Sequence, residues 1–275
     1  MTLKDKTALI TGSTDGVGAL VAKKLAALGI LVLVHGRNQA RGARLVGDIS
    51  KGGGRAQFYP ADFASLSGVR RLAENIQRDH QRLDILVNNA GIGTGGRNST
   101  REISEDGFEL RFAVNYLSGF LLTRLLIPLL RTSAPARIVN VASVGQEPIA
   151  FDNVMLERGY SGQRAYCQSK LAQVMFTFDL AQELTGTGIT VNCLHPATYM
   201  DTAMVRRDGI SPMSSVEDGA KAVLHIAISS ETKNRTGLYF DQMRQSRANA
   251  QAYDSAARQQ LRTLSYELSG LAILQ

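Results

Sequence analysis

The chain is short of the residues that mark disulfide-bonded, zinc-binding and membrane-spanning proteins. Its 275 residues include two cysteines, Cys167 and Cys193, and four histidines that lack the spacing of a metal site. We therefore expect reduced cysteines in an intracellular protein, and no structural metal. No window approaches the roughly 18 uninterrupted apolar residues of a transmembrane helix, and the N-terminal residues do not resemble a signal peptide. These absences predict a cytoplasmic protein without a membrane anchor.

Tryptophan is also absent, although the chain carries a formal net charge of +7. An excess of Lys and Arg is one mark of a nucleic-acid-binding protein. Here the basic residues are spread along the sequence rather than gathered into one run. This distribution favours a solvated basic surface that suits an anionic cofactor, and we expect no nucleic-acid partner.

Short apolar runs alternate with longer amphipathic segments along the chain. The runs predict buried strands at residues 7–11, 30–34, 56–59, 85–87, 138–141, 189–194 and 238–240. Helical patterns lie near residues 17–28, 39–50, 66–80, 108–130, 162–184 and 216–229. This alternation predicts an α/β fold in which a parallel sheet of about seven strands is flanked by helices on both faces.

No shift in composition divides the sequence, so we expect a single domain over residues 1–275. A helical pattern of about 30 residues follows residue 240 and predicts a C-terminal helical extension. Tyr253, Leu261, Leu264 and Leu268 are the positions of this extension that we expect to be buried.

A glycine-rich turn directly follows the first predicted strand, with the sequence Thr11-Gly12-Ser13-Thr14-Asp15-Gly16-Val17-Gly18. Glycines in such a turn let backbone N–H groups approach a diphosphate at the positive end of the next helix. The turn lacks the Lys-Ser/Thr ending of a P-loop, which disfavours an NTPase. Glycine-rich turns often serve chain reversal alone, but the position between strand and helix favours a dinucleotide site.

Further short motifs follow in a fixed order between residues 11 and 196. They are Asn88-Asn89-Ala90-Gly91, Asn115, Ser143, Tyr166-Cys167-Gln168-Ser169-Lys170 and His195-Pro196. Together with the Thr-Gly-x-x-x-Gly-x-Gly turn, this series resembles the short-chain dehydrogenase/reductase family. The segments 165–172 and 264–270 are most similar to its retinol-dehydrogenase-like branch. The resemblance covers practically the whole chain and implies one doubly wound, Rossmann-type domain.

The resemblance implies an oxidoreductase that exchanges a hydride between nicotinamide and an alcohol or carbonyl carbon. In that family the tyrosine, here Tyr166, passes a proton to or from the substrate oxygen, and Ser143 orients that oxygen. Lys170 holds the nicotinamide ribose, and Asn115 helps to anchor a proton-relay water. Because Tyr166 and Lys170 are four residues apart, they share a helix face, and we expect the ammonium to lower the pKa of the phenol.

Each of these four residues has a simpler structural interpretation. A Tyr–Lys pair at helical spacing is usually a surface pair, and a serine in this place can cap a helix. Asn115 stands in an apolar run, so it needs buried hydrogen-bond partners, which a purely structural role also supplies. The combination of the motifs favours catalysis over these separate interpretations.

The resemblance also implies which residues bind the cofactor. Residues 12–18 (Gly12, Ser13, Thr14, Asp15, Gly16, Val17, Gly18) surround the diphosphate, and Asn89, Ala90 and Gly91 lie beside the adenosine ribose. Asp62, followed by Phe63, meets the adenine, although a turn aspartate at the surface is an equal alternative. Asn115, Tyr166 and Lys170 border the nicotinamide half. Ala197 replaces the glycine that is common after Pro196, so either Thr198 or Thr202 is the contact to the carboxamide.

The end of the second strand distinguishes the two nicotinamide cofactors. An NAD-specific site offers a carboxylate to the ribose 2′-hydroxyl at this place. Here the strand ends in His35-Gly36-Arg37-Asn38, without an acid. Gly36 leaves space, and Arg37 can pair with a 2′-phosphate through its planar guanidinium. We therefore expect NADP(H) in preference to NAD(H); an arginine in a solvated loop is the alternative.

Two segments are expected to form the walls of the substrate site. Residues 145–163 contain Phe151, Val154, Met155 and Leu156, and residues 199–215 contain Met200, Met204, Val205 and Met213. Methionine-rich segments adapt to apolar ligands, which favours a lipophilic aldehyde, ketone or secondary alcohol. Many members of the resembled branch begin with an apolar anchor that this sequence does not show, which disfavours a membrane-borne retinoid.

Two other functional classes and the oligomeric state complete the expectations. The chain could be a non-catalytic NADP(H)-sensing regulator, which the presence of both Tyr166 and Lys170 disfavours, or an interaction scaffold with a basic surface. Val174, Met175, Phe176 and Phe178 give the helix near residues 162–184 more apolar surface than a monomer readily covers. This predicts a homodimer or homotetramer, unless the C-terminal extension covers that surface.

Overall fold

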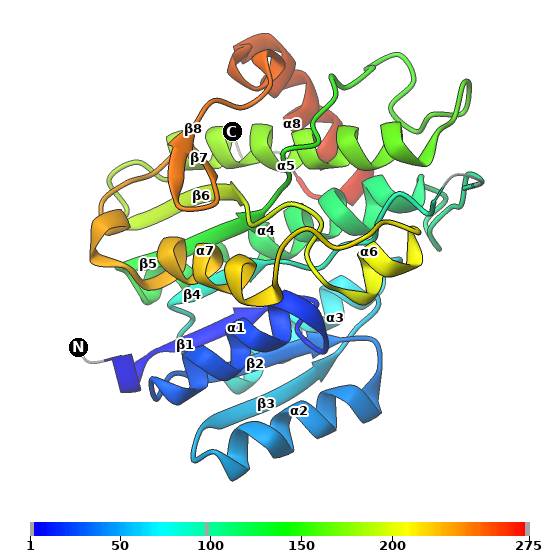
Figure 1. The fold of residues 1–275 in the computed structure, drawn as a ribbon. Helices are drawn as coiled ribbons and strands as arrows, with labels where there is room; N and C mark the ends of the chain where they lie inside the picture. The colour runs from blue at the N-terminus through cyan, green and yellow to red at the C-terminus, as the bar shows by residue number, and fades with distance from the viewer. Residues whose placement is uncertain (1–2, 97–98, 273–275) are drawn as a thin grey trace.

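A single sheet runs through the protein, in a computed structural model that describes residues 3–96 and 99–272 (Figure 1). Its strands are β1 (Thr7–Ile10), β2 (Leu31–Gly36), β3 (Arg55–Pro60), β4 (Ile85–Asn88), β5 (Ala136–Val141), β6 (Ile189–His195), β7 (Leu238–Asp241) and β8 (Arg244–Ser246). They lie in the order β3-β2-β1-β4-β5-β6-β7-β8, and each neighbouring pair is parallel except β7–β8. The predicted α/β fold with a parallel sheet is confirmed. The antiparallel edge strand β8 was not predicted because its three residues are all exposed and carry no apolar pattern.

Helices cover both faces of the sheet. They are α1 (Gly16–Ala27), α2 (Gln39–Lys51), α3 (Leu66–Asp79), α4 (Ser118–Thr132), α5 (Gly162–Glu183), α6 (Ala203–Arg207), α7 (Val216–Ile228) and α8 (Ser255–Ser269). Four short segments of other helix types are η1 (Leu3–Asp5), η2 (Phe112–Leu117), η3 (Ser230–Thr232) and η4 (Ala250–Tyr253). Helices α1, α2 and α7 pack on one face, and α3, α4, α5 and α8 on the other (Figure 1). The parallel strands are therefore buried on both sides, which explains their continuous apolar runs.

The helix predicted over residues 108–130 differs from the observed one. Residues 112–117 form a π-helical stretch, η2, that continues directly into α4. Residues 112–132 are also the one stretch among the described residues that is long and apolar enough to cross a membrane. In this fold 67% of its most apolar window is buried, and it packs on the sheet beside α3 and α5. Core helices pass the same test of length and composition, so the test alone does not identify a membrane span.

The C-terminal extension is helical, as predicted, and it completes the core on the α5 side. Leu261 is buried, and Leu264 and Leu268 pack against the core at partial exposure. The Tyr116 hydroxyl lies 2.7 Å from that of Ser265, which ties α8 to η2. The prediction that Tyr253 is buried is wrong: 45% of it is exposed, because its ring lies over Phe178 at the outer edge of α5.

Helix α8 also covers the apolar surface from which an oligomer was predicted. Val174 and Met175 are fully buried, and Phe176 is nearly so. The Arg124 guanidinium lies between α4, α5 and α8, 5.2 to 5.9 Å from the rings of Phe120, Phe176 and Tyr266. The intramolecular alternative therefore holds for this face. The homo-oligomer itself stays a prediction that light scattering can test.

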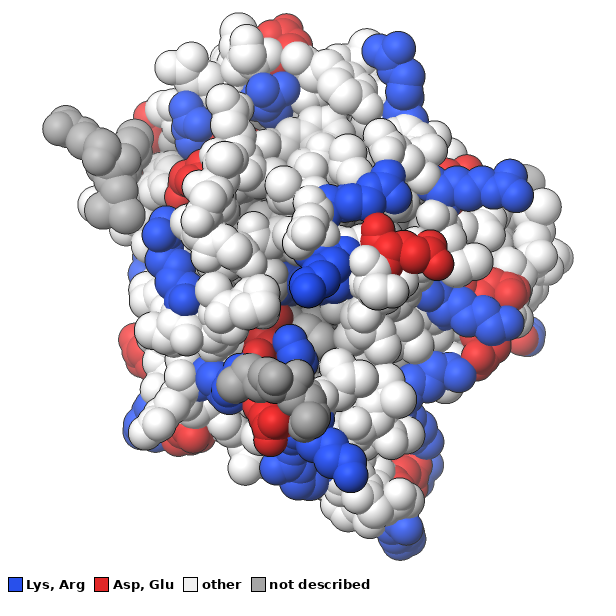
Figure 2. All heavy atoms as spheres, turned by 90° about the vertical axis from the view of Figure 1, so that its left-hand side faces the viewer, with Lys and Arg blue, Asp and Glu red and all other residues white. Residues whose placement is uncertain are grey.

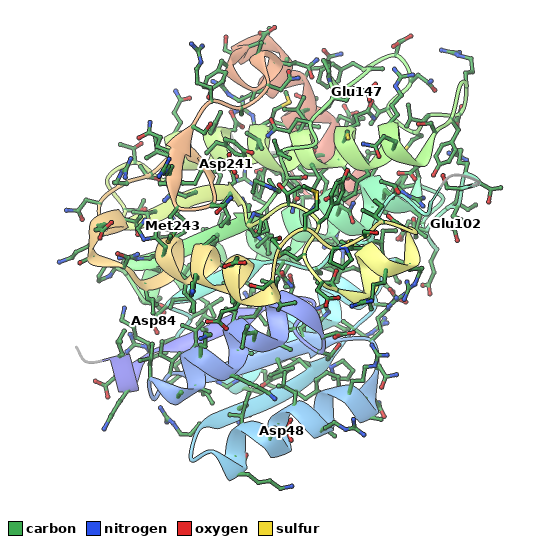
Figure 3. All side chains as sticks on the ribbon, viewed as in Figure 1. Asp48, Asp84, Glu102, Glu147, Asp241 and Met243 are labelled. Atoms are coloured by element: carbon green, nitrogen blue, oxygen red, sulfur yellow. The ribbon has the colours of Figure 1, made fainter. Side chains whose placement is uncertain are left out.

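The order of the strands places a crevice beside β1 and β4. The chain turns from β1 toward one edge of the sheet, and from β4 toward the other edge. In open parallel sheets, ligands bind outside the carboxyl ends of the strands at such a reversal. The carboxyl ends of the parallel strands lie on the right in Figure 1. Asp84 and Glu102, labelled in Figure 3, lie at opposite ends of the sheet, and Glu102 is on the side of the crevice.

Basic side chains are dispersed on the face of the molecule that Figure 2 shows. On the face that contains the amino ends of the strands, Lys and Arg side chains alternate with uncharged and acidic ones (Figure 2). Several basic side chains elsewhere are engaged by acids, such as Lys24 with Glu217 at 2.8 Å. On the face in Figure 2, the arrangement fits a solvated basic surface better than a continuous nucleic-acid track.

Candidate active site

The glycine-rich turn lies in the crevice because it joins the end of β1 to the start of α1. Gly12 and Gly16 have φ angles of +62° and +53°, which residues with a side chain rarely adopt. A Cβ on Gly12 would lie 2.7 Å from Ala90 Cα, and one on Gly18 would lie 2.6 Å from the Gly12 carbonyl oxygen. All three glycines are therefore required by the path of the backbone. The turn leads into the positive end of α1, where a diphosphate is favoured.

Buried polar groups hold this turn in place. The Ser13 hydroxyl donates to the Ile10 carbonyl at 2.7 Å and accepts from the His35 amide at 3.1 Å. Its side chain is therefore used within the turn, and Val17 points into the core behind α1. The Gly12 amide donates to His35 Nδ1 at 3.0 Å. Burial lowers the pKa of His35 to about 4, so the ring is neutral and Nδ1 is free to accept.

Thr11 joins the turn to the end of β4. Its hydroxyl accepts from the amides of Asn89, at 2.9 Å, and Ala90, at 3.0 Å. The Asn89 side-chain amide in turn donates to the carbonyls of Thr11 and Gly12. The predicted residues Asn89 and Ala90 thus lie beside the turn, and Gly91 lies next to Asn115 and Lys170.

The end of β2 carries more basic side chains than Arg37 alone. Arg37 is exposed and lies 3.6 Å from the carboxylate of the predicted residue Asp62. Arg41, which the sequence analysis missed, pairs with Asp15 at 3.1 Å. Its amide donates to the side chain of Asn38, which caps α2. No motif marks Arg41 in the sequence. It lies in the first turn of α2, and the fold brings it next to Asp15 of the glycine-rich turn.

Two further features shape this end of the site. Phe63, predicted as a cofactor contact, is buried and packs on the His35 ring with centroids 4.5 Å apart. The expectation that Gly36 leaves empty space is wrong. A Cβ there would lie 2.7 Å from Thr14 Cγ2 and 2.8 Å from its hydroxyl oxygen. The place of the missing acid is therefore filled by Thr14, another residue of the turn.

The predicted catalytic residues come together at the ends of β5 and along α5. Ser143 follows β5 and is almost buried, and its hydroxyl accepts from the Gly145 amide at 3.1 Å. Tyr166 and Lys170 share one face of α5, with Lys170 Nζ 5.7 Å from the centroid of the tyrosine ring. Lys170 is 5% exposed and donates to the Val141 carbonyl at 2.9 Å and to Gln173 Oε1 at 3.0 Å.

Burial dominates the electrostatics of the pair. It raises the pKa of Tyr166, and a hydrogen bond with the Ser143 side chain opposes that rise. The predicted lowering of the pKa of Tyr166 by Lys170 is therefore wrong for the protein without ligands, because desolvation of the phenolate outweighs nearby favourable groups. Burial also lowers the pKa of Lys170 to about 7.

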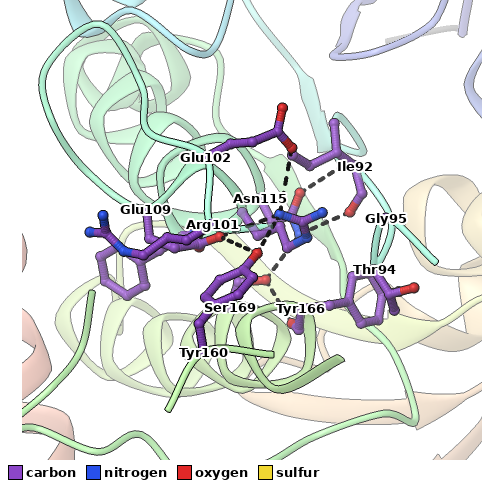
Figure 4. Close-up of polar contacts among 12 residues, drawn as sticks. Ile92, Thr94, Gly95, Arg101, Glu102, Glu109, Asn115, Tyr160, Tyr166 and Ser169 are labelled. Carbon is purple, nitrogen blue, oxygen red and sulfur yellow. Dashed lines mark hydrogen bonds and ion pairs between the residues drawn. The ribbon is translucent and has the colours of Figure 1, made fainter. Parts of the chain in front are cut away.

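Asn115 lies in the π-helical stretch η2 and is 1% exposed. Its side-chain oxygen accepts from the Ile92 amide at 2.7 Å, and its nitrogen donates to the Ile92 carbonyl and to Ser169 Oγ (Figure 4). Asn115 therefore joins the loop after β4 to α5 beside Lys170. Short π-helical stretches frequently occur at functional sites, which agrees with a role for this residue.

The loop after β4 is held from two more sides. Arg111 donates to the Gly93 carbonyl at 2.9 Å and to the Tyr160 hydroxyl at 2.7 Å, which connects the loop to the segment before α5. Asp208, at the end of α6, accepts from the Thr94 amide and hydroxyl, both at 2.8 Å. We call the contact of Asp208 with Thr94 the α6 clasp. It closes one side of the crevice with the segment that follows β6.

The segment after β6 contains the two candidate threonines. The Thr198 hydroxyl lies 3.1 Å from His195 Nε2, close to the buried Pro196. Thr202 caps α6, and its Cγ2 would lie 3.3 Å from a Cβ on Gly16. Thr202 is thus the threonine that lies against the glycine-rich turn.

The two segments expected to form the substrate walls differ in exposure, and their role stays a prediction. Val154 packs in the core on the α5 side, and Leu156 is fully buried. Met200 packs against the core on the other face. Met204 and Met213 are exposed, by 37% and 73%, so the segment after β6 offers the more accessible apolar side chains.

Comparison with known proteins agrees with this arrangement. A family model described as short chain dehydrogenase matches residues 6–210. The chain belongs to the short-chain dehydrogenase family. Human retinol dehydrogenase 13 is 35% identical over 291 residues, covering 98% of this chain and 86% of the relative, which places the chain in the retinol-dehydrogenase-like branch.

Solved structures of this family show the same fold. A complex of Pseudomonas aeruginosa RhlG with NADP superposes with a TM-score of 0.72 at 30% identity, covering 87% of this chain and 95% of that one. The 3-ketoacyl-(acyl-carrier-protein) reductase from Brucella melitensis, in complex with NADH, gives a TM-score of 0.70 at 29% identity, with coverages of 87% and 97%. The family and fold support a nicotinamide cofactor and an oxidoreductase that acts on an alcohol or carbonyl group.

Proposed function

We propose that this short-chain dehydrogenase uses NADP(H) to interconvert a lipophilic aldehyde or ketone and the corresponding alcohol, with Tyr166 as the acid and base. The observation that carries this proposal is the convergence of Ser143, Tyr166 and Lys170 at the sheet edge that also holds the glycine-rich turn. The glycines of that turn are required by its backbone conformation and by its close contact with Ala90. The bound nicotinamide supplies or accepts the hydride.

The chain's own residues account for the proton. Because burial raises the pKa of Tyr166, its phenol is protonated at neutral pH and can donate to the oxygen of a carbonyl undergoing reduction. The Ser143 hydroxyl, which interacts with the phenol, positions the same oxygen. Lys170 lies on the same helix face, with Nζ 5.7 Å from the centroid of the tyrosine ring, and is the residue that would hold the ribose.

The preference for NADP(H) rests on charge at the end of β2. Arg37 and Arg41 lie there, and their present partners, Asp62 and Asp15, are exposed carboxylates. A 2′-phosphate can accept charge-assisted hydrogen bonds from both guanidinium groups. The position that would carry an NAD-selecting acid is a glycine covered by Thr14. Of the two candidate threonines, we assign the carboxamide contact to Thr202, because it borders the crevice at Gly16, whereas the Thr198 hydroxyl lies 3.1 Å from His195 Nε2.

The substrate class follows from the exposed methionines after β6 and from the relatives. Met204 and Met213 offer an adaptable apolar surface. Several relatives are named retinol dehydrogenases, so retinal belongs in the substrate panel beside a straight-chain aliphatic aldehyde and a small polar aldehyde. We expect the highest kcat/KM with the apolar aldehydes.

The test combines cofactor binding with one substitution. NADPH and NADH are titrated by calorimetry, and the aldehydes are then assayed with the tighter cofactor. Tyr166→Phe should keep cofactor binding but lower kcat by about 10²- to 10⁴-fold, because only the reacting oxygen needs the phenol proton. Tyr116→Phe is the control: it removes a buried hydroxyl that is bonded to Ser265 of α8, and should leave kcat unchanged. Turnover of Tyr166→Phe within tenfold of wild type would contradict the proposal. Wild-type protein that binds the cofactor but turns over none of the aldehydes would favour a sensing regulator.

A further inference from the structure

The ammonium of Lys170 is held from below by two acceptors inside the protein. Nζ donates to the backbone carbonyl of Val141, in β5, and to the side-chain oxygen of Gln173, one turn further along α5. A lysine ammonium has three N–H donors. With two of them engaged, one donor direction remains for a group that enters the crevice.

The backbone of α5 at Gln173 is tied by a chain of buried polar groups to the centre of the sheet. Gln173 is 4% exposed, and its backbone carbonyl accepts from the Thr177 hydroxyl at 2.8 Å. The Thr177 hydroxyl accepts from the Asn140 side-chain amide of β5 at 2.8 Å, and Asn140 accepts from Asn88 of β4 at the same distance. The turn of α5 that carries Gln173 is therefore tied to two central strands.

Among the residues that the structure describes, Lys170 Nζ forms no ion pair with a carboxylate, and burial is the cause of its lowered pKa. The groups around Nζ on other elements are the Val141 carbonyl and the Asn115 amide; a Cβ on Gly91 would lie 3.6 Å from Nζ and 3.2 Å from Asn115 Oδ1. Tyr166, on α5 itself, is the neighbouring titratable group and is protonated at neutral pH. The Gln173 oxygen is thus the one side-chain acceptor bonded to the ammonium among the described residues.

We propose that Gln173 is a positioning residue, which holds the ammonium of Lys170 in the crevice and favours its charged form. The consequence for the reaction rests on the role proposed above for Lys170, whereas the contact itself does not. Burial brings the pKa of Lys170 to about 7, so the balance between its two forms is sensitive near neutral pH. A fall of one pKa unit would reduce the charged fraction at pH 7 from about one half to about one tenth.

Two substitutions at this position should act in opposite directions. Gln173→Leu removes the acceptor while keeping an apolar side chain of similar bulk, and should lower the pKa of Lys170 by about one unit. Gln173→Glu places a carboxylate at the same distance and should raise that pKa by about one to two units. Thr177→Val is the matched control, because it breaks the same polar chain without touching Lys170.

The pKa is measured directly on the protein without cofactor or substrate. The Cε resonance of ¹³C-labelled lysine is followed by NMR against pH, and its loss in Lys170→Met assigns the signal. The pH dependence of NADP⁺ affinity, measured by calorimetry, should shift in the same direction as the pKa in each variant. Opposite shifts for Leu and Glu, with no shift for Thr177→Val, support the proposal.

The proposal would be overturned if the pKa of Lys170 shifted in the same direction in Gln173→Leu and Gln173→Glu, or stayed unchanged in both. A shift in Thr177→Val as large as that in Gln173→Leu would also overturn it. If Gln173→Leu does not fold, Gln173→Glu decides alone: a raised pKa supports the contact and an unchanged one refutes it. Failure of wild-type protein to bind NADP⁺ or NADPH would refute the proposed function, and the titration without cofactor would still decide the role of Gln173.

Discussion

Acid should loosen the glycine-rich turn through a single buried side chain, His35. The ring is 2% exposed and packs on Phe63, and its Nδ1 accepts the amide of Gly12. Protonation of Nδ1 would replace this acceptor by a donor that faces another donor. The neutral ring is therefore part of the folded turn, and acid must disrupt the contact.

The size of this effect follows from the pKa. Burial lowers the pKa of His35 from 6.5 to about 4. Between these two values the unfolded chain binds the proton more readily than the folded one, so stability is fully present above pH 6.5 and is lost as pH falls toward 4. The difference of about 2.5 units corresponds to about 3 kcal/mol in total, of which about 2 kcal/mol is lost by pH 5.

The assay compares wild type with His35→Asn by urea unfolding at pH 7.5 and pH 5, followed by circular dichroism since the chain has no tryptophan. Asparagine offers an oxygen to the Gly12 amide but does not titrate. The free energy of unfolding should fall by about 2 kcal/mol less in the variant than in wild type. His80 and His195 also have lowered pKa values and add an acid-dependent loss that both proteins share. Equal losses in the two proteins would refute the assignment to His35.

Two further predictions concern the ends of the crevice. Arg37→Ala should weaken NADPH binding about 10- to 100-fold and leave NADH binding nearly unchanged, because only NADPH carries the 2′-phosphate that we propose the guanidinium binds. Arg41→Ala should act in the same direction, and equal weakening of both cofactors in calorimetry would contradict this. Asp208→Asn should open the α6 clasp and raise KM for the aldehyde. Since the charge of Asp208 raises the pKa of Tyr166, its removal should also move the Tyr166 limb of the pH–rate profile to lower pH, and an unmoved limb would show that the two side chains are uncoupled.

The sequence predicts the parts of this fold that depend on repeated local patterns. Seven strands and the long helices follow from apolar periodicity, and the residues of the site follow from the order of short motifs and the family resemblance that they carry. Edge strand β8 and the short helix α6 escaped because each has few residues and no buried face. The pairing of Thr14 with Gly36, and of Gln173 with Lys170, depends on how the chain packs, which spacing alone cannot show.

The pKa of Tyr166 shows a second limit of the sequence. Spacing placed an ammonium near the phenol and suggested a lowered pKa. The structure adds the desolvation of the phenolate, which acts in the opposite direction and is larger. Burial is a property of the whole fold, so the sign of such a shift cannot be derived from two residues in one helix.

The position of α8 has a consequence for the order in which the protein acquires its structure during synthesis. Tyr116 and Phe176 belong to a core that also needs Leu261 and Tyr266. These two residues are made about 85 or more positions after Phe176, so a nascent chain carries η2 and α5 with an open apolar side until its last helix emerges. During that interval this side is where chaperones or other nascent chains would bind, and closure by α8 ends that exposure.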